Sequence, residues 1–142
     1  MKAEATKGLD DPAYQTARAS LMRMAGPEGI DAILAKDHLD ALVCPTMPPA
    51  WKIDAANGDQ IGGGGAGGLA AIAGYPHLTV PMGVVMGLPV GLSIIGPAWS
   101  EARLLGYGYA YEQASQVRLK PHFLPSIEGA APIAPLLEPL HP

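Results

Sequence analysis

Charged residues are scarce in this chain. Asp, Glu, Lys and Arg make up only 15% of its 142 residues, whereas about 25% is typical of a soluble domain. So few charges leave too little polar surface to cover a small globule, so we expect either a largely apolar surface or a place inside a larger fold. The net charge is −4, and no basic cluster interleaves with aromatic residues. Nucleic acid is therefore not an expected partner.

Cysteine and long apolar runs are also scarce. Cys44 is the only cysteine, which excludes a disulfide within the chain. The longest apolar run, residues 84–95, is interrupted by Gly87, Pro89 and Gly91 and is too short to span a membrane. The N-terminal segment MKAEATKGLDD lacks the apolar core of a signal peptide, so we expect a cytoplasmic location.

No residue cluster has the spacing of a metal site. His38, His77, His122 and His141 are scattered along the chain, and no cysteine pair supports them. We therefore expect neither a metal nor a cofactor. Cys44, at the end of an expected strand, is expected to be a small buried hydrophobe and not a nucleophile.

The five serines lack the setting of a nucleophile. A serine amidase needs an activated hydroxyl beside a base, with donors aimed at the developing oxyanion. No two serines are adjacent, none lies in a glycine-rich loop, and no lysine has a motif context. Ser20, Ser100 and Ser115 fall in or at expected helices, Ser93 in an expected buried strand and Ser126 in a proline-rich tail. We therefore predict no catalytic residue in this chain.

Apolar residues at helical spacing predict three longer helices. The first begins at Pro12 after two aspartates that can cap it, and Gly26-Pro27 is expected to end or kink it. A second helix is expected over residues 28–37 and a third over 101–116, with Ser100 as its cap. The apolar face expected for the third helix is Leu104, Tyr107, Gly108, Tyr111 and Ala114.

Short apolar segments predict the strands. The expected strands are 39–44, which should be buried, then 77–80, 84–85 and 90–95, with a turn at 86–89. Strands mixed with helices indicate an α/β fold, here a partial mixed β-sheet with flanking helices. Since residues 92–95 are apolar apart from Ser93, this strand is expected to be covered on both faces.

Residues 45–68 predict a long irregular loop, followed by a short helix over 69–73. The run GGGGAGG in this loop is expected to be a flexible connector, because no strand leads into it and no Gly-Lys-Ser/Thr follows it. Trp51 lies in the same loop, where regular packing does not call for a large ring. It either contacts a ligand beside a cleft or fills a gap in the core.

Three blocks of sequence carry a resemblance to a known family. DALVCPT precedes the long loop, AAIAGYPHLTVP follows it, and GLPVGLSIIGPAWSE comes next, with LL and YAYEQAS behind it. Together they resemble the C-terminal portion of the amidase signature enzymes, from about residue 5 to residue 115. The blocks are specific for the family and say little about the substrate, although AGYPHLTVP looks closer to general bacterial amidases than to amidotransferase subunits.

The resemblance implies an amide hydrolase fold without its reactive centre. Members of the family use a Ser–cis-Ser–Lys triad, and everything that would hold that triad is missing here. In whole members this region completes a large mixed sheet and lines part of the substrate cleft, so Thr46 and Trp51 are expected to line that cleft. Residues 1–118 then form the C-terminal segment of an amidase-type domain, and residues 119–142 a proline-rich tail.

Two hypotheses about function follow. The chain is either a C-terminal amidase segment that is inactive alone, or a non-enzymatic interaction module. A partial sheet leaves strand edges and an apolar face uncovered, so we expect a homo-oligomer or a catalytic N-terminal counterpart as partner. The sequence does not choose among a fragment, a truncated gene product and one half of a split enzyme.

Overall fold

A computed structural model describes residues 8–60 and 62–121 of the chain. The helices are α1 (Pro12–Ala25), the π-helical turn η2 (Gly26–Ile30), α2 (Asp31–Lys36), α3 (Gly68–Ala73) and α4 (Glu101–Ser115), and the strands are β1 (Leu42–Pro45), β2 (His77–Val85) and β3 (Leu88–Ile95). This arrangement confirms the α/β fold class. The proposed tail 119–142 lies almost wholly outside the described residues, so its boundary stays a prediction.

The sheet has three strands in the order β1-β3-β2, and both pairings are antiparallel. Strand β3 is therefore the central strand, and each residue of its second half has a partner on both sides. Ser93, for example, lies opposite Cys44 of β1 and Thr79 of β2. Within the described part of the chain, no further strand pairs with the outer edge of β1 or of β2.

The β2–β3 hairpin is tighter and longer than the sequence predicts. Its turn consists of Met86 and Gly87, with φ of +52° and +80°, and two left-handed residues are what the favoured two-residue hairpin turn requires. The expected four-residue turn at 86–89 is therefore wrong, because Leu88 and Pro89 already belong to β3. The expected break between 80 and 84 is a bulge in one continuous strand, at Pro81 and Gly83.

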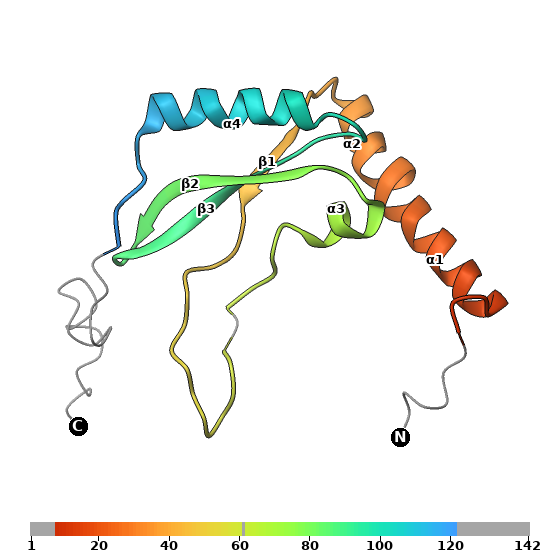
Figure 1. Cartoon of the computed structure of the whole chain (residues 1–142), viewed down its shortest axis with the longest axis horizontal. Helices are drawn as coiled ribbons and strands as arrows, with labels where there is room; N and C mark the ends of the chain where they lie inside the picture. Colours follow the sequence, from red (N-terminus) through yellow and green to blue (C-terminus); the bar gives the residue numbers. More distant parts are fainter. Residues whose placement is uncertain (1–7, 61, 122–142) are drawn as a thin grey trace.

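Helix α4 covers one face of this sheet, as Figure 1 shows. Leu104 is only 1% exposed, and Gly108 lets the helix approach closely. A Cβ at Gly108 would lie 2.5 Å from Leu78 Cδ2 and 3.2 Å from Val80 Cγ1. The expected apolar face of α4 is thus correct at Leu104 and Gly108, whereas Tyr107 and Ala114 are exposed.

The opposite face of the sheet packs against the other helices. Ile95 of β3 joins a buried cluster with residues of α1, η2, α2 and α3, namely Ala25, Ile30, Leu34, Ala70 and Ala73. Strand β3 is therefore covered on both faces over Ser93–Ile95, as its apolar sequence predicts.

Gly26-Pro27 kinks the first helix without ending it. The chain passes from α1 through the π-helical turn η2 directly into α2, and the N–H of Asp31 donates to the Gly26 carbonyl. Pro27 lies in the first turn of η2, where its missing N–H removes no necessary bond. The hydroxyl of Tyr75 donates to Asp31 Oδ2 at 2.5 Å, and this bond raises the pKa of Tyr75.

Strand β1 is shorter and more open than predicted. It runs over Leu42–Pro45 and not 39–44, and Val43 is 65% exposed. The expectation of a buried strand is therefore wrong. The physical reason is its position at the edge of the sheet, since α4 packs on β2 and β3 and leaves the Val43 side of β1 uncovered.

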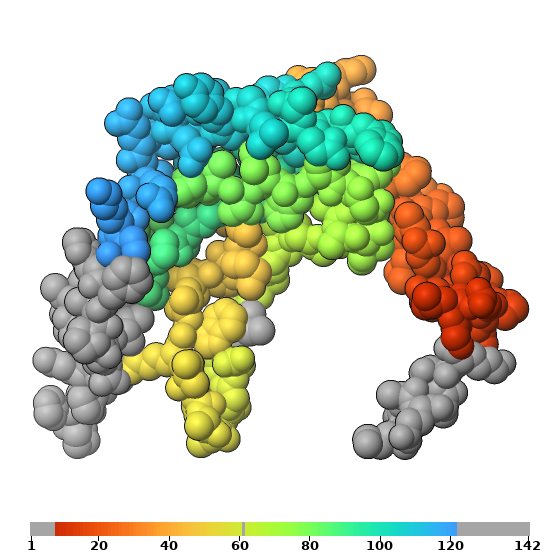
Figure 2. Space-filling model, in the orientation of Figure 1, coloured from red at the N-terminus to blue at the C-terminus, as the bar shows by residue number. Residues whose placement is uncertain are grey.

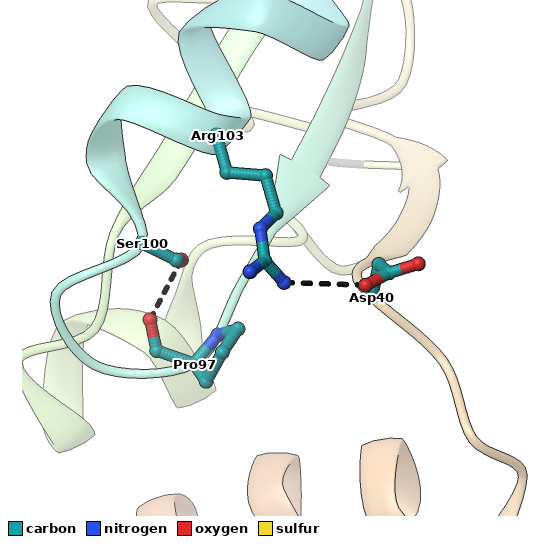
Figure 3. Close-up of polar contacts among 4 residues, drawn as sticks. All are labelled: Asp40, Pro97, Ser100 and Arg103. Carbon is teal, nitrogen blue, oxygen red and sulfur yellow. Dashed lines mark hydrogen bonds and ion pairs between the residues drawn. The ribbon is translucent and has the colours of Figure 1, made fainter.

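Ser100 stands at the N-cap position of α4, but its side chain does not cap the helix. Its hydroxyl donates instead to the Pro97 carbonyl at 2.7 Å, and this bond holds the turn between β3 and α4 (Figure 3). Arg103 also donates to Asp40 at 3.2 Å and so ties α4 to the segment before β1. Both of these charged side chains are exposed, so the pair contributes at most about 1 kcal/mol.

The described chain has the outline of an open arch (Figure 2). The sheet and α4 form its crown, α1 descends on one side, and the loop between β1 and α3 hangs below the sheet. The space between that loop and α1 is hollow in this view. The inner side of the arch is therefore exposed.

The close contact at Gly108 predicts opposite effects for two neighbouring glycines of α4. Gly106→Ala meets open space and should raise the free energy of unfolding by about 0.5–1 kcal/mol, because alanine favours a helix. Gly108→Ala gains the same propensity but pushes α4 off the sheet, so it should lower the free energy of unfolding by about 1–3 kcal/mol. Urea denaturation of the two variants measures both changes. Equal stabilisation by both would contradict the packing of α4.

Candidate functional site

Four polar side chains, from β2, from β3 and from the residue that follows β1, form a continuous row on the sheet. His77 Nε2 lies 2.6 Å from Ser93 Oγ, and Ser93 Oγ donates to Thr46 Oγ1 at 2.8 Å. Thr46 Oγ1 in turn donates to Thr79 Oγ1 at 3.5 Å. We call His77, Ser93, Thr46 and Thr79 the hydroxyl row. It lies on the face of the sheet that carries Ile95, opposite α4.

Strand alternation and register bring the row together. His77 and Thr79 are two residues apart on β2 and so share a face, and Thr79 lies directly opposite Ser93. Thr46 follows the last residue of β1, and its N–H donates to the Gly91 carbonyl at 2.8 Å. Gly91 leaves room for both threonines, since a Cβ there would lie 2.7 Å from Thr79 Cγ2 and 2.9 Å from Thr46 Oγ1.

The row is most buried at Ser93 and open at Thr79. Ser93 is 0% exposed, His77 and Thr46 are half-buried, and Thr79 is exposed. A serine hydroxyl has one proton, and that of Ser93 goes to Thr46. His77 Nε2 is the donor in its contact with Ser93 when the imidazole carries a proton on Nε2. The hydroxyls of Ser93 and Thr46 then both accept and donate, which strengthens the chain of bonds.

A nucleophilic serine gives its proton to a general base. Here the hydroxyl of Ser93 donates to the hydroxyl of Thr46, which is not a base. The hydroxyl of Ser100 donates to the Pro97 carbonyl. Ser126 lies outside the described residues. The prediction that this chain holds no catalytic residue stays a prediction.

The two residues expected to line a cleft occupy different settings. Thr46 is a member of the row and also the first residue of the loop. Its carbonyl accepts from the N–H of Ala66 at 2.9 Å, so it also holds the far end of the loop. Trp51 lies further along the same loop, half-buried, and is not a member of the row. The structure therefore joins Thr46, but not Trp51, to Ser93 and His77.

His77 and Ser93 were not recognised as a pair from the sequence. The signal that could have found them is that Ser93 is the one polar side chain in residues 92–95, and that His77 and Thr79 alternate on an otherwise apolar strand. A buried hydroxyl needs a partner, so two polar positions on neighbouring strands indicate a bonded pair once the strand register is known.

The remaining sequence predictions concern Cys44, metal ions and membrane-spanning helices. Cys44 is half-buried in β1, so it is less buried than expected. Within residues 8–60 and 62–121, no group of three or more His, Cys, Asp or Glu side chains has the geometry to hold a metal ion. In the same ranges, no helix has the length and apolar content to cross a bilayer.

Comparison with known proteins identifies the family. The family model described as Amidase matches residues 2–105, which is well over half of the chain. A fold of this kind, with helices on both sides of the sheet, also occurs in solved amidases. The chain belongs to the amidase family, the amidase signature enzymes.

The similarity covers most of this chain but a small part of its relatives. A solved peptide amidase from Stenotrophomonas maltophilia is 54% identical with a TM-score of 0.77, over 86% of this chain and 24% of that one. An amidase family protein from Bacillus anthracis is 30% identical with a TM-score of 0.61, over 84% and 20%. A glutamyl-tRNA(Gln) amidotransferase subunit from Pseudomonas entomophila is 40% identical over 93 residues, which are 60% of this chain and 18% of that protein.

The row predicts a graded loss of stability along its length. Ser93→Ala should lower the free energy of unfolding by about 1–3 kcal/mol, because His77 Nε2 and Thr46 Oγ1 both lose a buried partner. Thr79→Val at the open end should lower it by less than about 0.5 kcal/mol, because the 3.5 Å bond is weak and water can replace it. Urea denaturation compares the two. An equal or larger loss in Thr79→Val would show that Ser93 is not the centre of the row.

Proposed function

We propose that this chain is the C-terminal part of an amidase signature hydrolase, that it helps to line the substrate cleft, and that it does not hydrolyse amides alone. Family membership over residues 2–105 supports the first point. The second rests on the loop that leaves Thr46 and carries Trp51. The observation that carries the third is the hydroxyl row, in which the serine beside the histidine is fully buried and donates to Thr46.

Amide hydrolysis makes demands that the row does not meet. The attacking oxygen must reach a carbonyl carbon, a base must take its proton, and donors must hold the oxyanion. Ser93 has no access to solvent, and its hydroxyl is in contact with His77 and bonded to Thr46. The row therefore stabilises the wall of a site and does not perform chemistry.

The uncovered apolar surface supports a catalytic counterpart. Val43 is 65% exposed, Trp99 92% and Ile53 95%, although all three side chains are large and apolar. An open groove of about 450 Å³ lies between α1 and α3, lined in part by Leu21, Met22 and Ile72. Exposed apolar surface of this kind marks contact with other protein. The proposed occupant is the part of the amidase fold that holds the reactive centre.

The relatives favour a hydrolase over a component of an amidotransferase. Identity with the solved peptide amidases is 54–55%, against 40% with the glutamyl-tRNA(Gln) amidotransferase protein. An amide at the end of a peptide is therefore the substrate class we propose for the whole enzyme. The chain spans about a quarter of those peptide amidase chains, so this activity belongs to the complete fold.

The purified chain should release no ammonia from simple amides or from a peptide amide. Ammonia release is measured for the parent chain and for variants of each serine, with Ser93→Ala as the first and Ser100→Ala as its matched control. Turnover that disappears on changing one serine would contradict the proposal.

The alternative, a non-enzymatic module, is supported by the same open strand edges and apolar surface. Sedimentation of the same preparation distinguishes it, since a module of that kind should form stable oligomers that an N-terminal counterpart does not dissociate.

A further inference from the structure

Thr46 connects the sheet to both ends of the long loop. Its N–H donates to the Gly91 carbonyl of β3 at 2.8 Å, and its carbonyl accepts from the N–H of Ala66 at 2.9 Å. Its side chain accepts from Ser93 at 2.8 Å. The first residue of the loop is thus bonded at once to the central strand, to the end of the loop and to the buried hydroxyl.

The tip of the loop is ordered locally, by a turn that does not involve the sheet. The carboxylate of Asp54 accepts from the N–H groups of Ala56 and Asn57 and from Asn57 Nδ2, each at 2.9 Å. These bonds, with the backbone N–H of Asn57 first among them, lower the pKa of Asp54. The turn gives the tip a shape, but it does not fix where the tip lies relative to the strands.

The base of the loop is held to the sheet through Thr46. Met47 packs against Gly65, so the two arms of the loop are in contact beside Thr46. A loop of this length gains conformational entropy when its ends are released, and the bonds of Thr46 oppose this release. The side chain of Thr46 is held in turn by its bond from Ser93. Because Ser93 has no access to solvent, a water molecule cannot replace Thr46 as its partner.

We propose that Ser93 and His77 are positioning residues, which act through Thr46 to hold the loop 46–66, and with it Trp51, in one place against the sheet. His77 Nε2 lies 2.6 Å from Ser93 Oγ and so holds the Ser93 hydroxyl in its place beside Thr46. Ser93 then orients Thr46, and Thr46 closes the loop on Ala66. The inference rests on the proposed function only in its consequence, which is that the held loop is a wall of the substrate cleft.

Trp51 itself reports on this proposal. The chain has two tryptophans, so Trp99→Phe leaves Trp51 as the single fluorescent indole. In that background the 142-residue chain is compared with Ser93→Ala, with Thr46→Val and with Thr46→Ser. Thr46→Val keeps the shape of the side chain and removes its hydroxyl, whereas Thr46→Ser keeps the hydroxyl. Ser100→Ala is the matched control, because its hydroxyl bonds the Pro97 carbonyl and not the loop.

Quenching of Trp51 by acrylamide should increase roughly twofold in Ser93→Ala and in Thr46→Val, because a released loop exposes its side chains. Thr46→Ser and Ser100→Ala should keep the quenching constant of the parent. The amide proton of Ala66 should exchange faster in Thr46→Val than in Thr46→Ser. Far-UV circular dichroism should be the same in all variants.

Unchanged quenching in Ser93→Ala and Thr46→Val, with reduced stability, would overturn the proposal and leave the row a purely structural element. If Ser93→Ala does not fold, the pair Thr46→Val and Thr46→Ser decides, because position 46 is only half-buried. The assay needs no substrate. Its failure would leave the amidase proposal in place, and failure of the amidase proposal would leave the positioning role of Ser93 and His77 in place.

Discussion

A hydroxyl group with no access to water must find its hydrogen-bond partners inside the protein, and Ser93 is such a group. It lies in the second half of the central strand, where strands on both sides and helices on both faces exclude solvent. A buried hydroxyl left without partners costs about 1–3 kcal/mol, which is a large share of the stability of a small fold. His77 and Thr46 satisfy it, and this requirement links β2, β3 and the start of the long loop.

The same bonds explain why a serine and a histidine 2.6 Å apart need not be catalytic. A catalytic pair transfers the serine proton to the imidazole, but here the serine donates away from the imidazole to Thr46. A Ser–His contact is therefore compatible with the proposal that the chemistry belongs to another part of the amidase fold, since the chain spans a quarter of the solved peptide amidase. The exposed apolar side chains along the arch are consistent with such dependence.

Local sequence patterns predicted the helices and strands, but they did not predict which residues meet across the sheet. Helix α4 and the apolar strand β3 follow from the spacing of residues that are close in sequence. The row does not, because Thr46 and Ser93 are 47 positions apart and meet only once both strand registers are fixed. One local signal misled, because the apolar residues before Pro45 indicated burial where β1 is an open edge. Gly26-Pro27 indicated an end or a kink, and a π-helical turn stands there.

The most direct test of this account is the tautomer of His77, measured by 15N NMR at an alkaline pH where the imidazole is neutral, with His77→Gln used to assign its signals among the four histidines of the chain. The account predicts that the proton is on Nε2, which donates to Ser93. A proton on Nδ1, with Nε2 accepting from Ser93, would contradict it, because Ser93 would then be directed toward a base and not toward Thr46.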